Sequence, residues 1–379
     1  MKEGWKMVKL EDVCNIKGGS TPLKSNKLFW ENGTIPWFTV DDIREQGRVI
    51  NYTSKHITEL ASQKLCIYPI DTILLCCTAS VGEYAITKIE TTSNQQFNGL
   101  MIKDKSTLLP EYLFHFSSTL KDKLLKLSGK TTIDFVSVSK LSEILLPLPP
   151  LEEQHRIVSI LDVAFEKIDA LKANAEENLK NAKALFQQVL AQELKPKEGW
   201  VEKKLGEVAK EIFAGGDAPK NNMSKMSTEK YKIPIYANAV EDDGLYGFTD
   251  YARVNEPAIT IVARGSGTGY VLRRNIPFLP IVRLIVVLPK DIVDINYIYY
   301  ALKNMTIRKT GSAIPQLTVP MIREYKINYP NIKEQHRIVQ TLDALSEKCR
   351  RLETIAQQTI RECDALKQSI LRQAFSGKL

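Results

Sequence analysis

Several short motifs could hold phosphate or do chemistry, but each departs from the pattern that works. Residues 128–131 read Ser-Gly-Lys-Thr like the end of a phosphate-binding loop, yet Leu124 stands where that loop needs glycine. Residues 265–269 read Gly-Ser-Gly-Thr-Gly and lack the Gly-x-Gly-x-x-Gly spacing of dinucleotide sites. No tetrapeptide like the Asn-Pro-Pro-Tyr of amino-methyltransferases occurs. The sequence therefore predicts a chain that is not an enzyme.

Histidine and cysteine are too scattered to predict a metal site. Of the four histidines, His155 and His336 recur in equivalent positions, which favours packing or capping over metal binding. The six cysteines contain no Cys-x-x-Cys pair, so we expect reduced, structural thiols and a cytoplasmic location. We expect this chain to bind no metal and no cofactor of its own.

One segment of the chain is repeated almost without change. The run Glu153-Gln-His-Arg-Ile-Val-Ser-Ile-Leu-Asp162 returns 181 residues later as Glu334-Gln-His-Arg-Ile-Val-Gln-Thr-Leu-Asp343. The Lys-Glu-Gly-Trp that ends at Trp5 also returns, ending at Trp200. The order is a variable unit, a constant segment, a second variable unit and a second constant segment. A repeat of this length predicts two copies of one supersecondary plan.

The constant segments have the apolar spacing of a coiled coil, with polar Asn178 and Thr359 inside the stripe. We call this stripe the helix seam. Its predicted large members are Ile157, Leu161, Ile168, Leu171, Leu185, Ile338, Leu342, Leu345, Leu352 and Leu366. The short linker after residue 194 cannot reach back along a helix, so antiparallel packing is favoured. That packing relates the variable units by an approximate two-fold axis.

The variable units have mixed α and β signals. Apolar runs predict buried strands at 73–77, 259–263 and 281–288, and helices are expected at 110–127 and 294–305. The fold class is therefore α+β: two globular mixed α/β domains joined by two long antiparallel coiled-coil helices in a pseudo-two-fold repeat. The expected boundaries are 1–150 for the first domain, 151–196 for the first helix, 197–330 for the second domain and 331–379 for the second helix.

Composition narrows the class of protein. The chain has 379 residues, 44% of them hydrophobic, and no apolar run long enough to span a membrane, so we expect no membrane partner. The formal net charge is +8. This modest excess suits a protein that touches phosphates on one face while other faces meet partner proteins.

Several motifs together resemble the specificity subunit of type I restriction-modification systems. They are the Gly-Trp-Lys that starts at Gly4, the Gly-Gly-Ser-Thr-Pro that ends at Pro22, Ile-Pro-Trp at 35–37, the Thr-x-x-Asp-Phe-Val ending at Val136, and Pro-Leu-Pro-Pro-Leu-Glu-Glu-Gln-His-Arg-Ile-Val at 147–158. The resemblance covers the whole chain. The second copy departs from it, with Tyr-Pro-Asn-Ile at 329–332 in place of Leu-Pro-Pro-Leu.

The resemblance implies a function and a set of partners. Each variable unit would be a target recognition domain that reads one half of a bipartite, asymmetric site on double-stranded DNA. The helices would fix the spacing between the half-sites and bind two methyltransferase (modification) subunits. Restriction (translocase) subunits would complete the complex. S-adenosylmethionine, ATP and Mg would be used on the partner subunits, and this chain would catalyse nothing.

Polar residues in the loops are the candidates for DNA contact, because amide side chains suit adenine edges and cationic side chains suit guanine and phosphate. In the first unit they are Lys17, Gly19, Ser20, Thr21, Thr39, Asp41, Thr78, Ser80, Asn94, Gln95, Gln96, Lys130 and Thr131. In the second unit they are Asn238, Arg264, Ser266, Arg273, Arg274, Arg308, Lys309 and Ser312. Trp5 and Trp200 are expected to anchor domain cores instead.

Other functions stay open from the sequence alone. The chain could be the specificity chain of a related restriction system that cuts near its site. It could also be a coiled-coil scaffolding protein with no DNA role. A methyltransferase or nuclease in its own right is disfavoured by the missing motifs.

Overall fold

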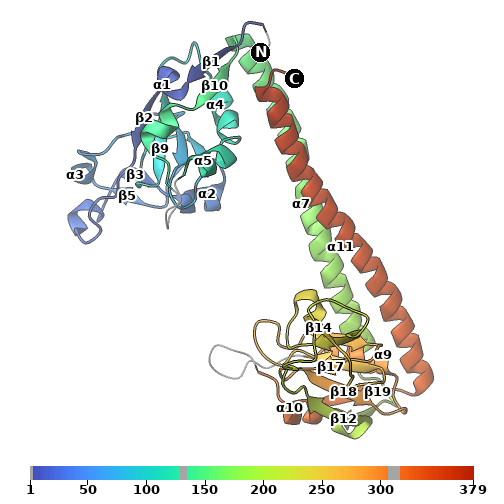
Figure 1. Cartoon of the computed structure of the whole chain (residues 1–379). Coiled ribbons are helices and arrows are strands. Elements are labelled where there is room, and N and C mark those ends of the chain that lie inside the picture. The colour runs from blue at the N-terminus through green and yellow to red at the C-terminus, as the bar shows by residue number, and fades with distance from the viewer. Residues whose placement is uncertain (1–2, 129–134, 306–315) are drawn as a thin grey trace. The chain divides into compact units, whose positions relative to one another are not determined.

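The computed structural model describes residues 3–128, 135–305 and 316–379, which form two compact units. Unit 1 comprises Met1–Ala175 and Gln358–Leu379, and unit 2 comprises Glu176–Gln357. Each unit contains one mixed α/β domain and a part of both long helices (Figure 1). The predicted α+β class with two repeated domains is confirmed.

The domain of unit 1 is built on a five-stranded sheet of order β2-β9-β6-β7-β4, with a three-stranded sheet β5-β3-β8 and the pair β1-β10. The elements in chain order are β1 (Lys6–Lys9), α1 (Leu10–Val13), β2 (Cys14–Gly18), η1 (Lys27–Phe29), β3 (Ile35–Phe38), α2 (Val40–Gln46), β4 (Val49–Ile50), β5 (His56–Ile57), α3 (Glu59–Ser62), β6 (Ile73–Cys76), β7 (Tyr84–Thr87), β8 (Thr92–Ser93), β9 (Phe97–Ile102), α4 (Pro110–Ser117), α5 (Lys121–Leu127), α6 (Val138–Ser142) and β10 (Leu145–Leu148).

The domain of unit 2 repeats this plan with a four-stranded sheet β12-β18-β15-β16, a three-stranded sheet β14-β13-β17 and the pair β11-β19. Its elements are β11 (Val201–Lys204), α8 (Leu205–Val208), β12 (Ala209–Ala214), β13 (Ile233–Tyr236), η2 (Glu241–Gly244), β14 (Leu245–Thr249), β15 (Ala258–Ile261), β16 (Val271–Arg274), β17 (Leu279–Pro280), β18 (Ile285–Pro289), α9 (Ile295–Lys303), α10 (Val319–Glu324) and β19 (Lys326–Tyr329).

Two expected elements differ from those observed. The helix expected at 110–127 is divided into α4 and α5, because the hydroxyls of Ser118 and Thr119 donate to the carbonyls of His115 and Phe116 and compete with the helical bonds. The strand expected at 281–288 begins only at Ile285. Val282 and Arg283 have φ values of 50° and 63°, which no strand accommodates.

The repeated Gly-Trp lies just before the first strand of each domain. Gly4 and Gly199 have φ values of 81° and 82°, a conformation that favours glycine. Trp5 is buried in the core of unit 1, and Trp200 packs against the core of unit 2. The prediction that both tryptophans anchor domain cores is confirmed.

The long helices are α7 (Leu151–Glu193) and α11 (Ile332–Phe375). In unit 1, Lys172 pairs with Asp364 at 2.7 Å, and Arg156 donates to the carbonyl of Leu379 at 2.7 Å. As the number rises along α7 it falls along α11, so the helices are antiparallel there. In unit 2, Arg337 near the start of α11 pairs with Glu193 at the end of α7, which gives the same direction.

The helix seam is confirmed at Ile157, Leu161, Ile168, Ile338 and Leu342, which are all buried. Leu345 is half-buried and packs on the core of unit 2. Four predicted members are wrong, because they are 46–53% exposed: Leu171, Leu185, Leu352 and Leu366.

The seam passes one residue beyond each of these leucines. One row of the seam has buried residues seven positions apart, such as Ala175 and Ala182. A second row lies four residues after each member of the first. Lys172 and Lys367 occupy that row, half-buried, and their ammonium groups pair with Asp364 and Asp169 on the other helix. Because a lysine stem covers the seam while its charge forms an ion pair, hydropathy alone points to the neighbouring leucine. Asn178 is likewise exposed and lies outside the seam.

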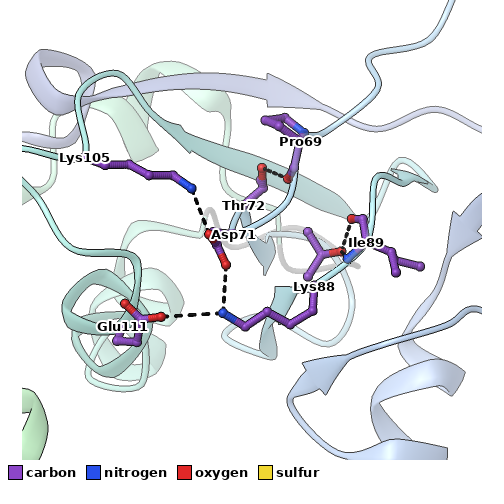
Figure 2. A network of polar contacts seen from close by, with 8 residues as sticks. Pro69, Asp71, Thr72, Lys88, Ile89, Lys105 and Glu111 are labelled. Atoms are coloured by element: carbon purple, nitrogen blue, oxygen red, sulfur yellow. Dashed lines mark hydrogen bonds and ion pairs between the residues drawn. The ribbon is translucent and has the colours of Figure 1, made fainter.

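A polar network ties the sheet of unit 1 to α4 (Figure 2). Asp71 accepts from Lys88 at 2.7 Å and from Lys105 at 2.8 Å, and Lys88 also pairs with Glu111 on α4 at 3.5 Å. Partial burial raises the pKa of Asp71, but the two ammonium groups outweigh it and hold the pKa below its usual value. Lys88 and Lys105 therefore form their ion pairs within the domain of unit 1.

Candidate nucleic-acid interface

Two loops of unit 1 meet at Gly19. Its N–H donates to the carbonyl of Phe97 at 2.8 Å, and the N–H of Ser20 donates to that of Ser93, also at 2.8 Å. A Cβ added at Gly19 would lie 2.3 Å from the carbonyl oxygen of Asn94. Only glycine allows this approach, so the glycine loop predicted as a recognition loop is held against the loop at 93–96.

Side chains then join the two loops. The hydroxyl of Thr21 donates to the side-chain oxygen of Gln95. The side chain of Asn94 donates to that of Gln96 at 3.0 Å and accepts from the N–H of Gln96, also at 3.0 Å. The strand end at Cys77 is attached to the same loop, because its N–H donates to the carbonyl of Gln96 at 2.8 Å. We call residues 19–21, 78–80 and 94–96 turn cluster 1.

A hollow of about 410 Å³ opens beside turn cluster 1. Four of its lining residues are predicted DNA contacts: Thr39, Asp41, Asn94 and Gln96. The others were missed from the sequence: Lys24, Trp30, Trp37, Val40 and Lys55. Amides, cations and an edge-to-face tryptophan pair with ring centroids 5.0 Å apart thus share one concave surface. These are the groups that contact base edges, phosphates and base faces.

Thr39 has a structural task in this hollow. It is buried, and both its N–H and its hydroxyl donate to Asp42, which caps the start of α2. Its side chain therefore serves the fold. Ser80 lines a second hollow of about 440 Å³ with Arg44 and Lys121, two cations that were also missed. Lys17 is exposed on β2, next to the glycine loop.

Unit 2 carries the same framework. The N–H of Gly215 donates to the carbonyl of Leu284 at 2.8 Å, as that of Gly19 does to Phe97. The carbonyl of Ala263 accepts from Leu317 at 2.7 Å, as that of Cys77 does from Val136 at 2.9 Å. We call residues 215–216, 264–266 and 281–283 turn cluster 2. Arg264 and Ser266 are exposed there, in the place that Thr78 and Ser80 have in unit 1.

Three predicted contacts of unit 2 support the domain instead. Asn238 donates to the carbonyl of Arg264 at 3.0 Å and accepts from the N–H of Ala263, so it positions the arginine loop. Arg274 is buried, with its guanidinium centre 3.6 Å from the ring centroid of Tyr236. Arg273 contacts Asn296 and Asp343. Internal partners thus occupy both arginines, and their contact with DNA stays a prediction.

Five predicted contacts lie outside the described residues. They are Lys130, Thr131, Arg308, Lys309 and Ser312.

Each domain is attached to its long helix through a joint that is nearly identical in the two units. In unit 1, the side-chain oxygen of Gln154 accepts from the N–H of Leu109 at 2.9 Å, just before α4, and its amide donates to the carbonyl of Pro149 at 2.9 Å. In unit 2, Gln335 accepts from Asp294 at 2.9 Å and donates to Pro330 at 2.8 Å. Both glutamines are buried. The repeated Glu-Gln-His-Arg motif therefore carries the joint.

The second half of the joint uses an aspartate further along each long helix. In unit 1, Nε2 of buried His115 donates to Asp162 at 2.8 Å. In unit 2, the hydroxyl of Tyr300 donates to Asp343 at 2.6 Å. Unit 1 thus has a histidine, which can be protonated, where unit 2 has a tyrosine.

Acid is therefore expected to weaken unit 1 through His115. Burial outweighs the attraction of Asp162 and lowers the pKa of His115 below 6.5. The unfolded chain then takes up the proton first, so folding stability falls as the pH drops below about 6.5. When the pH is lowered from 7.5 to 5.5, the Tm of His115→Tyr should fall by roughly 2–4 °C less than the Tm of the native chain. An equal loss in both proteins would exclude His115 as the titrating group.

Few of the described side chains are suited to a catalytic role. Burial raises the pKa of Cys14 to about 12 and that of Cys77 to about 11, so these thiols are poor nucleophiles. No group of three or more His, Cys, Asp or Glu side chains among residues 3–128, 135–305 and 316–379 is placed to hold a metal ion. Over the same ranges, every helix falls short of the length or the apolar character needed to cross a bilayer.

Known proteins resemble this chain in sequence. The family model "Type I restriction modification DNA specificity domain" matches residues 2–181 and again residues 197–362. The EcoprrI specificity subunit of Escherichia coli is 28% identical over 352 residues, which cover 88% of this chain and 86% of that one. A putative type I specificity subunit of Mycoplasma pneumoniae is 36% identical over 208 residues, which cover 54% of this chain and 56% of that one.

Two solved structures share the fold. A chain from a study of complex assembly and conformational transition in a type I R-M system has a TM-score of 0.81 at 21% identity, and the match covers 100% of this chain and 99% of that one. The HsdS subunit of Thermoanaerobacter tengcongensis has a TM-score of 0.57 at 20% identity, covering 100% and 98%. With the family model matched twice across most of its length, this chain belongs to the type I restriction-modification DNA specificity family.

Proposed function

We propose that this chain is the DNA-reading subunit of a type I restriction-modification complex, in which each domain reads one half of a bipartite, asymmetric site on double-stranded DNA. The observation that carries the proposal is the combination of a constant joint with different turn clusters. Turn cluster 1 presents amides and hydroxyls, whereas turn cluster 2 presents arginine. Two equal frameworks with unequal side chains suit two different half-sites.

The long helices would set the half-site spacing and dock two methyltransferase subunits. Support comes from the four exposed leucines, which are equivalent in pairs: Leu171 and Leu352 are 181 residues apart, and so are Leu185 and Leu366. Unit 1 contains Leu171 and Leu366, and unit 2 contains Leu185 and Leu352. Each unit thus offers one pair, with one leucine from each helix, as two identical partners would require.

The chemistry would belong to the partners. Adenine methylation with S-adenosylmethionine would take place on the methyltransferase subunits, and ATP with Mg²⁺ would drive translocation on the restriction subunits. This chain would supply base contacts and geometry, without catalytic groups of its own.

Co-expression of the chain with its cognate methyltransferase subunit, followed by genome-wide mapping of methylated adenine, tests the proposal. We expect a split motif with a fixed spacer. Exchanging residues 1–150 for those of a relative should change one half of the motif, and exchanging residues 197–330 should change the other half. Because the joint is common to both units, the exchanged chains should still assemble.

A different result would identify another function. If the complex assembles but methylation is absent, or if one continuous motif ignores both exchanges, the chain does not read two half-sites. A scaffolding role would then explain the coiled coil better.

A further inference from the structure

Arg283 occupies the place in unit 2 that Gln96 has in unit 1. The N–H of Asn94 donates to the carbonyl of Phe38 at 3.2 Å, and that of Ile281 donates to the equivalent Tyr236 at 2.9 Å. Three residues on, the N–H of Phe97 closes its turn on Asn94 at 3.3 Å, and that of Leu284 closes on Ile281 at 3.1 Å. Gln95 and Gln96 of unit 1 are therefore equivalent to Val282 and Arg283 of unit 2.

Arg264 likewise occupies the place of Thr78. Thr78 forms an antiparallel bridge with Phe135, and Arg264 forms the same bridge with Gln316. Each lies just after a buried strand of the central sheet: Thr78 is two residues beyond the end of β6, and Arg264 is three residues beyond the end of β15. At two equivalent positions, an uncharged side chain of unit 1 is thus replaced by arginine in unit 2.

The two arginines share one hollow. Arg264, Arg283 and Gln316 line a space of about 260 Å³, together with the apolar side chains of Ala214 and Ile285. Among the described residues that line it, none is acidic. Two guanidinium groups without a carboxylate between them favour a partner that is rich in hydrogen-bond acceptors.

The backbone that carries Arg283 is fixed in a strained turn. Val282 and Arg283 have φ values of 50° and 63°, and for a β-branched residue such as Val282 this is an outlier. The N–H of Val282 donates to the carbonyl of Gly216 at 2.7 Å, and that of Arg283 to Gly215 at 3.2 Å. In unit 1, Gln95 and Gln96 have no such φ values. Of these two equivalent turns, the one that presents arginine is thus the one with left-handed backbone.

We propose that Arg264 and Arg283 read the major-groove edge of guanine in the half-site of unit 2, with Arg283 as a specificity-determining residue. The inference rests on the proposed function and names the base that this hollow recognises. The O6 and N7 atoms of guanine accept two parallel hydrogen bonds from one guanidinium, which a fixed backbone can aim. A DNA phosphate offers similar acceptors but demands no particular base, and the experiment distinguishes these two sources.

The test compares Arg283→Ala, Arg283→Lys and Arg264→Ala in the complex with its methyltransferase subunits. Each alanine variant should lose roughly tenfold to hundredfold of its discrimination at one guanine of the second half-site, while the first half-site stays unchanged. Arg283→Lys should lose discrimination too, because an ammonium group cannot form the parallel pair. Lys290→Ala is the matched control: it removes a cation just after the opposite end of β18 and should leave the motif intact.

Duplex binding at several salt concentrations gives the second readout. A guanine contact leaves the salt dependence of the Arg283→Ala complex nearly unchanged, whereas a phosphate contact lowers its slope by about 1. A lower slope, or native discrimination in Arg283→Lys, would overturn the proposal. So would a second half-site without guanine in the native motif. Absence of any split motif in the native complex would instead contradict the proposed function itself, and binding of both alanine variants to the first half-site shows that they fold.

Discussion

Removing residues 175–181 and 356–362 together, one heptad from each long helix, is expected to shorten the spacer between the two half-sites by about three base pairs. Seven helical residues correspond to about 10.5 Å, and base pairs of DNA are stacked about 3.4 Å apart. The deleted segments are equivalent in the repeat, and they leave all four exposed leucines in place. Methylation mapping of the shortened chain measures the spacer directly.

The shortened helices should still pair, because a heptad deletion keeps the seam in register. Buried Ala182 takes the place of Ala175 on α7, and buried Cys363 takes the place of Ala356 on α11. The control is a chain with one heptad removed from α7 alone, which should assemble poorly because the two helices no longer match. If the doubly shortened chain methylates DNA with the native spacer, the helices do not set the spacing.

Replacing Leu171 and Leu366 together by aspartate is expected to remove one of the two docked methyltransferase subunits. About half of each side chain is exposed, and its burial by a partner would contribute roughly 1 kcal/mol. A carboxylate in its place must lose water without gaining a partner. We therefore expect at least a tenfold loss of affinity at this site. Native mass spectrometry should show the complex change from two methyltransferase subunits to one.

The paired variant Leu185→Asp with Leu352→Asp should remove the other subunit, and the fourfold variant should remove both. Asn174→Asp with Gln373→Asp adds the same charge at exposed polar positions of unit 1 and should leave two subunits bound. All six positions are exposed, so the helices should remain folded, and circular dichroism checks this. Two bound subunits in the fourfold variant would place the docking surface elsewhere.

The repeat made much of the fold predictable from the sequence, but it could not show which side chains fill the seam. Leucine at 171 and 366 outranks lysine at 172 and 367 on any hydropathy scale, yet the lysines lie in the seam. Their ammonium groups reach aspartates on the opposite helix, and no property of a single helix reveals that partner. The choice depends on a contact between residues almost 200 positions apart.

The candidate interface was predictable in part for a similar reason. Asn94 and Gln96 lie in a polar loop of the kind that carries recognition residues, and the structure places both at one hollow. Arg283 was missed because it lies inside the apolar run 281–288, which reads as strand. Its exposure follows from the left-handed turn at Val282, and valine gives no signal for that conformation. Only the hydrogen bonds shared with unit 1 show that it is equivalent to Gln96.

The joint between domain and helix has a consequence for how such a chain can change over generations. On the domain side, both glutamines contact main-chain groups: the N–H of Leu109 or Asp294, and the carbonyl of Pro149 or Pro330. Main-chain groups persist through almost any point mutation, whereas side chains do not. Surface loops can therefore drift, or be inherited from another lineage, while attachment to the helices is preserved. New sequence preferences would then arise without a new solution to assembly.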